Sequence, residues 1–180
     1  DVTGTGYAPH GSITLNNKEI ADSNENFSLK NTLLAGTLCS TARVIEKDGM
    51  WVVEGDPTEG ALLVSAKKVG IHPDSVSQSY PLLDSIPFES EYQYMATLHS
   101  NAENDSNIVF IKGSVESIVD RCSFSASIHD EAIDPSEQLL YTKANEYALQ
   151  GLRVLAFAMK IVPKSKTTIS HEELVDDLVF

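Results

Sequence analysis

The stretch that most restricts how this chain can fold is residues 108–113, where an apolar run ends in a lysine and a glycine. The first four residues are β-branched or aromatic, which predicts a strand buried on both faces. Gly113 lets the backbone turn sharply, and Ser114 can accept hydrogen bonds from the first N–H groups of a following helix. Lys112 therefore lies at the end of a buried strand. Its ammonium group must either extend to water or meet a polar ligand held against an apolar wall.

Length and charge narrow the class of protein. The 180 residues, of which 42% are hydrophobic and 22% charged, have the composition of one globular domain. The formal net charge of -13 argues against nucleic acid and against an anionic membrane surface as partners, since both select basic faces. No apolar run approaches the roughly 20 residues needed to cross a bilayer. We expect a monomer that is not itself inserted in a membrane.

Metal, disulfide and catalytic motifs are not predicted. Cys39 and Cys122 lie far apart, and the five histidines are scattered without ligand spacing. Residues 171–173 begin like a zinc-protease helix, but Val175 stands where the second histidine is required. The sequence also lacks a G-x-x-x-x-G-K-[ST] loop and a G-x-S-x-G elbow. From motifs alone we expect a domain without catalytic residues and with a pocket that tolerates an anion.

Two predicted helix starts carry the same cap sequence. Asp56 and Asp134 each precede a proline and, three residues on, a glutamate, which is the pattern of a helix N-cap. Glu59 therefore has a structural explanation as the return arm of a capping box. In addition, Asp48-Gly49 predicts a two-residue hairpin turn.

The predicted elements mix hairpins with helices, which is typical of an α+β fold. The chain opens without methionine and closes on an apolar triplet, so we expect a piece of a longer protein whose last strand continues into a neighbouring part. The expected helices lie at residues 29–41, 57–69, 115–122, 135–150 and briefly after Ser170; strands lie at 13–15, 43–54 in two halves, 80–88, 95–99, 108–112, 152–162 and 178–180; residues 71–78 form a loop.

Four short motifs then occur in one order along the chain. They lie at residues 55–62, at Pro87-Phe88 with Met95, at residues 112–116 and at residues 151–156. In this order they resemble the G-x-P-T-E-x-A-L, P-F-x-S-x-x-x-x-M, K-G-A-P-E and G-x-R-x-L-A segments of P-type cation-transporting ATPases, in the prokaryotic-like subgroup of calcium or sodium/potassium pumps. Residues 3–7 and 177–180 also resemble the flanking segments of that family, so the resemblance covers essentially the whole chain.

The resemblance implies the nucleotide-binding (N) domain of such a pump. Residues 1–180 would be a single domain, with the ends at 1–6 and 178–180 approaching the hinge to the phosphorylation domain. Its fold would be a twisted antiparallel sheet of about six strands flanked by helices. It would bind ATP, with Mg²⁺ carried by the nucleotide, and present the γ-phosphate to the phosphorylation domain.

The same resemblance places the chain in the cytoplasmic part of an integral membrane protein, beside the phosphorylation and actuator domains. The family's D-K-T-G-T and T-G-E-S motifs are absent from this sequence. We therefore expect the chain to bind ATP without hydrolysing it, whereas the parent protein would hydrolyse ATP to transport cations.

Seven positions are assigned to the nucleotide by this resemblance. Phe88 would stack on adenine, an interaction worth about 1–3 kcal/mol between aromatic side chains and bases elsewhere. Lys112 would lie deep in the pocket beside the base, Glu59 would contact the adenine end, and Arg153 would reach ribose or phosphate. The remaining three would permit close approach, form the pocket wall or pack beneath the base: Gly113, Met95 and Leu155.

Departures from the family pattern keep alternatives open. Ser90 and Gln93 occupy positions that are often basic in the family, which predicts a weak hold on the triphosphate and reliance on the base. Locally, Phe88 could be a core residue, Glu59 a helix cap, and Arg153 the partner of a carboxylate.

One rival function is an interaction or regulatory domain of the same fold that needs no nucleotide. A second rival is a standalone phosphotransferase, for which the sequence offers no aspartyl nucleophile motif.

Overall fold

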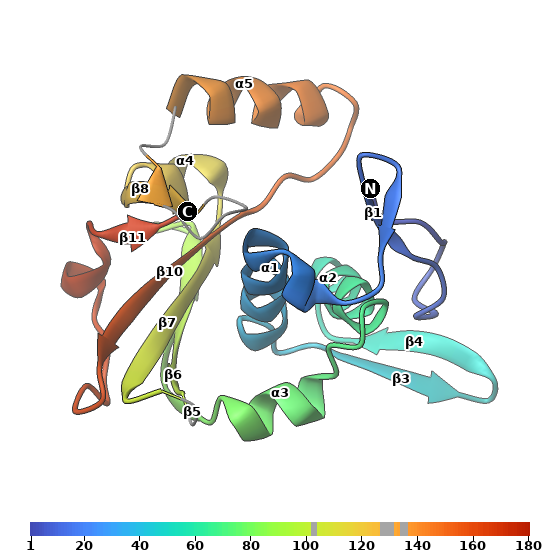
Figure 1. Cartoon of the computed structure of the whole chain (residues 1–180), viewed down its shortest axis with the longest axis horizontal. Coiled ribbons are helices and arrows are strands. Elements are labelled where there is room, and N and C mark those ends of the chain that lie inside the picture. Colours follow the sequence, from blue (N-terminus) through green and yellow to red (C-terminus); the bar gives the residue numbers. More distant parts are fainter. Residues whose placement is uncertain (102–103, 127–131, 134–136) are drawn as a thin grey trace. The chain divides into compact units, whose positions relative to one another are not determined.

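The computed structural model describes residues 1–101, 104–126, 132–133 and 137–180 (Figure 1). These residues divide into two compact units, Asp1–Gln78 and Ser79–Phe180. Each unit has its own hydrophobic core. The expectation that residues 1–180 form one domain stays a prediction.

The first unit combines two hairpins with helices. Its core lies between α2 and the second hairpin and contains Ala42, Val44, Leu63 and Val64, with Tyr7, Trp51 and Val53 packed against them. The elements are β1 (Ile13–Leu15), β2 (Lys18–Ile20), the 3₁₀ helix η1 (Ser23–Glu25), α1 (Phe27–Leu38), β3 (Arg43–Lys47), β4 (Met50–Glu54) and α2 (Pro57–Lys67); α3 (Pro73–Ser79) spans the boundary between the units.

The start of α2 follows the predicted cap. The Asp56 Oδ1 atom accepts hydrogen bonds from the N–H groups of Thr58, at 2.7 Å, and Glu59, at 3.1 Å. Pro57 is the first helical residue, where its missing N–H costs no hydrogen bond. After the helix, Gly70 has a φ of +78°, the left-handed conformation that ends many helices.

Helix α1 and the β3–β4 hairpin also lie near their predicted places. α1 begins two residues early because the Asn26 Oδ1 atom accepts a hydrogen bond from the Leu29 N–H at 2.8 Å, and it ends at Leu38 instead of residue 41. The hairpin turn is the predicted one, since Asp48 and Gly49 have φ angles of 52° and 76°. Both residues must have positive φ in this turn.

The second unit is built on one mixed sheet. In the described residues it has seven strands in the order β5-β6-β7-β10-β11-β8-β9, with β5 at one edge (Figure 1). The predicted α+β class and the flanked sheet are confirmed, but the sheet is not wholly antiparallel, because β11 runs parallel to β8. The strands are β5 (Leu82–Glu89), β6 (Tyr94–Ser100), β7 (Ser106–Gly113), β8 (Cys122–Ala126), β9 (Ala132–Ile133), β10 (Ala156–Pro163) and β11 (Leu178–Val179).

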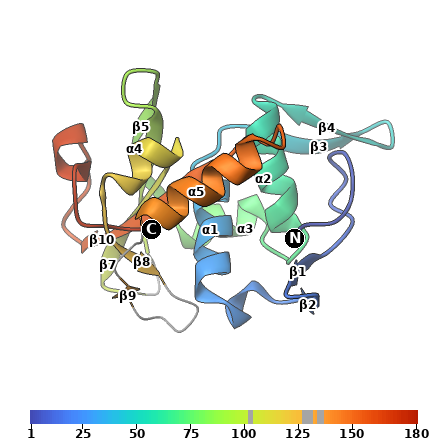
Figure 2. The ribbon, with the colours of Figure 1, turned by 90° about the horizontal axis from the view of Figure 1, so that it is seen from above.

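One face of this sheet holds the core of the unit. It packs against α4 (Val115–Val119), α5 (Glu137–Ala148) and residues around the 3₁₀ helix η2 (His171–Leu174). Helix α5 lies alongside α4 in both views of the ribbon (Figures 1 and 2). The fully buried side chains of this core include Tyr94, Leu98, Val109, Ile111, Ile118, Val119, Leu174 and Leu178.

Several predicted boundaries are wrong. Residues 71–78 are not a loop, because α3 begins at Pro73; this helix buries Val76 alone and so shows no apolar stripe. The helix predicted at residues 115–122 ends at Val119, and Cys122 already starts β8. Strands β2, β8 and β9 were not predicted at all. The predicted cap at Asp134 lies outside the described residues.

Candidate functional site

The edge strand β5 carries an exposed aromatic residue, Phe88. Phe88 is 59% exposed, so the interpretation that it is a core residue is wrong. Between Ile86 and Glu89, β5 has one residue more than β6, and as a result Pro87 and Phe88 both stand opposite Met95. A bulge of this kind re-aims a side chain and is common next to binding sites.

Three side chains form a row across the neighbouring strands. Met95 of β6 is paired with Lys112 of β7, which is paired with Phe157 of β10. Directly paired residues of antiparallel strands project to the same face of a sheet. With Phe88 at the outer edge, the row is apolar except for one cation. Lys112 is 7% exposed, which argues against an ammonium group extended into bulk water.

The turn between β5 and β6 closes over the end of β7. A Cβ atom added to Gly113 would lie 2.5 Å from the carbonyl oxygen of Gln93 and 2.7 Å from the Tyr94 Cβ atom, so no larger residue fits. The missing side chain of Gly113 therefore allows the β5–β6 turn to pack closely against the end of β7. Its predicted role toward a nucleotide remains a prediction.

Gln93 has a structural role in the same turn. It has a φ of 57°, and its carbonyl oxygen accepts a hydrogen bond from the Ser114 N–H at 3.0 Å. Its side-chain Oε1 atom accepts a second from the Ser114 hydroxyl at 3.1 Å. Gln93 thus ties the β5–β6 turn to the start of α4. Ser90, the other position expected to be basic in the family, is exposed on the turn.

Arg153 and Leu155 lie before the first residue of β10. The strand predicted at residues 152–162 begins only at Ala156, so neither Arg153 nor Leu155 is a strand residue. Arg153 is exposed, Leu155 is half-buried, and Arg153 forms no ion pair with a carboxylate in the part of the chain that the structure describes. The guanidinium group is therefore available to an anion.

Glu59 belongs to the first unit, whereas the other six predicted residues belong to the second. Its Oε2 atom accepts hydrogen bonds from the N–H groups of Thr41, at 2.8 Å, and Ala42, at 3.0 Å, and from the Thr41 hydroxyl at 3.2 Å. The carboxylate thereby fixes the segment between α1 and β3 to the start of α2. Its predicted contact with the nucleotide remains untested.

Sequence reasoning missed an aromatic cluster at the turn that follows Phe88, formed by Tyr92, Tyr94 and His171. His171 of η2 stacks on Tyr92 with ring centroids 3.8 Å apart, and its Nδ1 atom is hydrogen-bonded to the Tyr94 hydroxyl at 2.7 Å. The partners are 77 residues apart in the sequence, and no local pattern joins them. The closeness of Tyr92 and Tyr94 in the sequence was the only available signal.

Burial shifts the pKa of titratable groups in the second unit, Cys122 and His99 among them. Burial raises the pKa of the Cys122 thiol to about 12, so it is not a thiolate nucleophile at neutral pH. Burial also lowers the pKa of His99, which keeps this imidazole neutral. Among the described residues, no group of three or more His, Cys, Asp or Glu side chains is placed to hold a metal ion. An exposed aromatic ring on a strand edge and a lysine in the neighbouring apolar row are groups that can contact an aromatic, anionic ligand.

In the part of the chain that the structure describes, every helix is too short or too polar to span a bilayer.

Known proteins match this chain over most of its length. It is 39% identical over 187 residues to the cation-transporting ATPase pma1 of Synechocystis, which covers 100% of this chain and 20% of that protein. It is 39% identical over 158 residues to the probable cation-transporting ATPase F of Mycobacterium tuberculosis, covering 87% and 17%. It is 36% identical over 179 residues to the calcium-transporting ATPase of Bacillus subtilis, covering 98% and 20%. The chain thus spans about a fifth of the length of these relatives.

The family comparison agrees with the order of the four motifs and with the α+β fold. Residues 28–180 match the model of the P-type ATPase cytoplasmic domain N. This match includes residues 28–78 of the first unit, the whole second unit and all seven predicted site residues. Domains of this family bind nucleotides in general. The chain belongs to the P-type ATPase cytoplasmic domain N family.

Proposed function

We propose that this chain binds ATP, with Mg²⁺ carried by the nucleotide, and presents the γ-phosphate to the phosphorylation domain of a cation-transporting P-type ATPase. The observation that carries the proposal is Phe88, which is 59% exposed in a bulge beside the row of Met95, Lys112 and Phe157. An aromatic ring left in water at such a place has a face on which a base can stack.

The base, in this proposal, supplies most of the affinity. Lys112, the cation of an otherwise apolar row, would lie deep in the pocket beside the base. Arg153, which is exposed, would reach ribose or phosphate. Gln93 is neutral and bonded to Ser114, and Ser90 is neutral, so neither adds a charge toward the phosphates. AMP should therefore bind nearly as well as ATP.

The remaining residues complete the proposed site. Gly113 would permit close approach, Leu155 would pack beneath the base, and Met95 would line the pocket wall. Glu59 would contact the adenine end in addition to holding Thr41 and Ala42.

The parent protein is proposed from the relatives. They are named as cation-transporting ATPases, and one as a calcium-transporting ATPase. We therefore infer a membrane-embedded pump of the calcium or sodium/potassium type, in which this chain is a cytoplasmic domain next to the phosphorylation and actuator domains. The parent would hydrolyse ATP, and this chain alone would only bind it.

The test is a titration of the 180-residue chain with ATP, ADP and AMP, followed by backbone amide NMR shifts. Binding near 1 mM, about -4 kcal/mol, would still be detected. The proposal predicts shifts centred on Phe88, Lys112 and Glu59, similar affinities for the three nucleotides, and weaker binding by Lys112→Ala. The absence of any shift at saturating nucleotide would overturn it.

One observation favours a rival. The two positions that are often basic in the family are occupied by Ser90 and Gln93. This is what an interaction or regulatory domain that has lost nucleotide binding would show. The same titration separates the two functions, because that rival predicts no nucleotide-dependent shift in any residue.

A further inference from the structure

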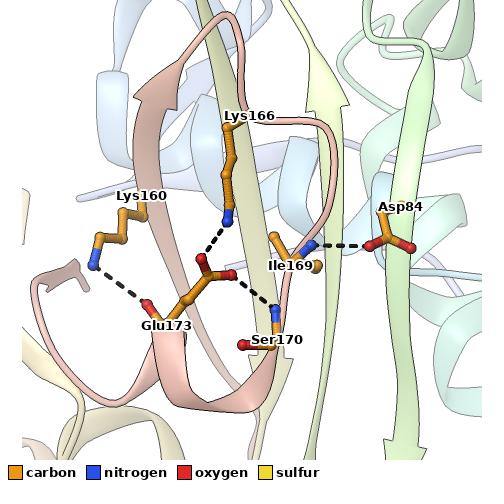
Figure 3. Close-up of polar contacts among 6 residues, drawn as sticks. All are labelled: Asp84, Lys160, Lys166, Ile169, Ser170 and Glu173. Carbon is orange, nitrogen blue, oxygen red and sulfur yellow. Dashed lines mark hydrogen bonds and ion pairs between the residues drawn. The ribbon is translucent and has the colours of Figure 1, made fainter.

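The segment that follows β10 is fixed to the sheet by polar contacts at several points (Figure 3). Residues 164–176, here called the C-terminal segment, contain the 3₁₀ helix η2. The Ile169 N–H donates to the Asp84 carboxylate of β5 at 2.9 Å. On the other side, Lys160 of β10 donates to the carbonyl oxygens of Glu173, at 3.4 Å, and Asp176, at 3.2 Å. The segment therefore spans from the middle of the sheet to its edge.

Within this segment, the position of η2 is fixed by its own cap. The Glu173 carboxylate accepts a hydrogen bond from the Ser170 N–H at 3.1 Å and forms an ion pair with Lys166 (Figure 3). This is a capping box, and it sets the direction in which the first helical residue, His171, leaves the backbone.

His171 makes three contacts with the β5–β6 turn. Its ring stacks on Tyr92, its Nδ1 atom is hydrogen-bonded to the Tyr94 hydroxyl, and its Nε2 atom lies 3.7 Å from the Glu89 carboxylate. In the tautomer with the proton on Nε2, Nδ1 accepts from the hydroxyl and Nε2–H faces the carboxylate. The three partners are the residues on both sides of the bend that follows Phe88.

Two further charged residues lie near these contacts. The Arg121 guanidinium lies over the Tyr94 ring, 4.9 Å from its centroid, and Glu172 adjoins His171 in η2. Burial, the largest cause, raises the pKa of Tyr94, so its hydroxyl stays protonated and able to donate.

The turn is thus held from two sides. On one side, the N–H of Ser114 and the hydroxyl of Ser117 donate to the Gln93 carbonyl, at 3.0 and 3.3 Å. On the other side stands His171. Phe88 is the residue directly before this doubly held turn, and its own side chain is mostly in water. The orientation of the Phe88 side chain is therefore set mainly by the backbone on either side of Phe88, because its ring packs against few other groups.

We propose that His171 is a positioning residue for the base site: it holds residues 89–94 so that Phe88 presents its ring face to the nucleotide. This inference rests on the proposed function. It adds a residue from the C-terminal segment, outside the four family motifs, to the determinants of nucleotide affinity. Preorganisation of this kind raises affinity without a contact to the ligand.

The experiment measures two quantities on the 180-residue chain and its variants. The first is hydrogen exchange of the amides of residues 89–93 without nucleotide, and the second is affinity for AMP and ATP. His171→Ala removes all three contacts, and Tyr94→Phe removes one hydroxyl. Both should speed exchange in the turn and weaken nucleotide binding about two- to tenfold, the equivalent of one neutral hydrogen bond. His171→Phe keeps the stacked ring and should recover part of the affinity.

Lys160→Met is the matched control. It loosens the same segment at β10 without a contact to the turn, and should leave both quantities at their wild-type values. Equal losses in Lys160→Met and His171→Ala would mean general loosening of the segment and would overturn the inference. Unchanged turn exchange in His171→Ala would overturn it too.

Failure of this inference differs from failure of the proposed function. If the wild-type chain binds AMP and ATP and the His171 variants bind equally well, the inference alone is overturned. If the wild-type chain binds no nucleotide, the proposed function is overturned, and the role of His171 in binding falls with it.

Discussion

Replacement of Phe88 by alanine separates a ligand-binding aromatic from a structural one. Truncation of a fully buried phenylalanine costs about 3–5 kcal/mol of stability. Phe88 is 59% exposed, so burial of its side chain contributes less than half of the full transfer free energy of a phenylalanine. We therefore expect Phe88→Ala to lower the free energy of unfolding by roughly 1 kcal/mol. The loss of stacking on a base is worth about 1–3 kcal/mol. Affinity for AMP should therefore fall about 5- to 150-fold while the fold survives.

Two assays on the same samples test this contrast. Urea unfolding gives the stability, and amide NMR titration with AMP gives the affinity. Leu82→Ala is a matched control, because Leu82 lies on the same strand and is 60% exposed; it should leave the affinity unchanged. A Phe88→Ala variant that loses several kcal/mol of stability, or one that binds AMP as tightly as wild type, would refute the reasoning.

Three further predictions concern the surroundings of the site. Gly113→Ala places a methyl group 2.5 Å from the Gln93 carbonyl oxygen, and should cost about 1–3 kcal/mol in urea unfolding; an unchanged midpoint would contradict this. Glu59→Ala removes the acceptor of two backbone N–H groups and should destabilise by about 1.5–3 kcal/mol, whereas Glu59→Gln keeps an acceptor and should lose less. The hydrogen bond from Lys166 holds the pKa of Glu173 below its ordinary value of 4.5. A carboxyl group whose pKa is lower in the folded than in the unfolded state stabilises the fold above the unfolded-state pKa, and this stabilisation is lost as the pH falls through the folded-state pKa. In urea unfolding, the stability advantage of wild type over Glu173→Gln should therefore shrink as the pH falls below 4.5. A difference in stability that stays constant with pH would contradict this prediction.

The parts of the fold that could be predicted are those with strong local chemistry. Asp48-Gly49, the Asp56 cap and the apolar run before Lys112 each have few conformations open to them, and the structure confirms all three. Helix α3 escaped prediction because it is short, polar and buries Val76 alone. The parallel pairing of β11 with β8 joins residues about 55 positions apart, and no local pattern encodes such a contact.

For the site, the motifs identified residue positions but not the orientation or the hydrogen-bond partners of the side chains. The sequence placed Phe88 in a strand without revealing the extra residue that turns it outward. It placed Gln93 at a position expected to face phosphate, whereas in the structure the side chain and the carbonyl oxygen of Gln93 both accept hydrogen bonds from Ser114. His171 could not be found, because its contacts with Tyr92 and Tyr94 depend on the path of the whole C-terminal segment.

The irregular course of β5 has a second consequence, for solubility. β5 is an edge strand, and an exposed edge can recruit another chain by strand pairing. Here Pro87 lacks the N–H that such pairing requires, and the ladder to β6 is interrupted between Leu82 and Asp84 and again between Ile86 and Glu89. The edge therefore offers no long, regular template for a second molecule, although Leu82 and Leu83 are open to solvent. The distortion that presents an aromatic ring to a ligand also protects the molecule from fibre-like association.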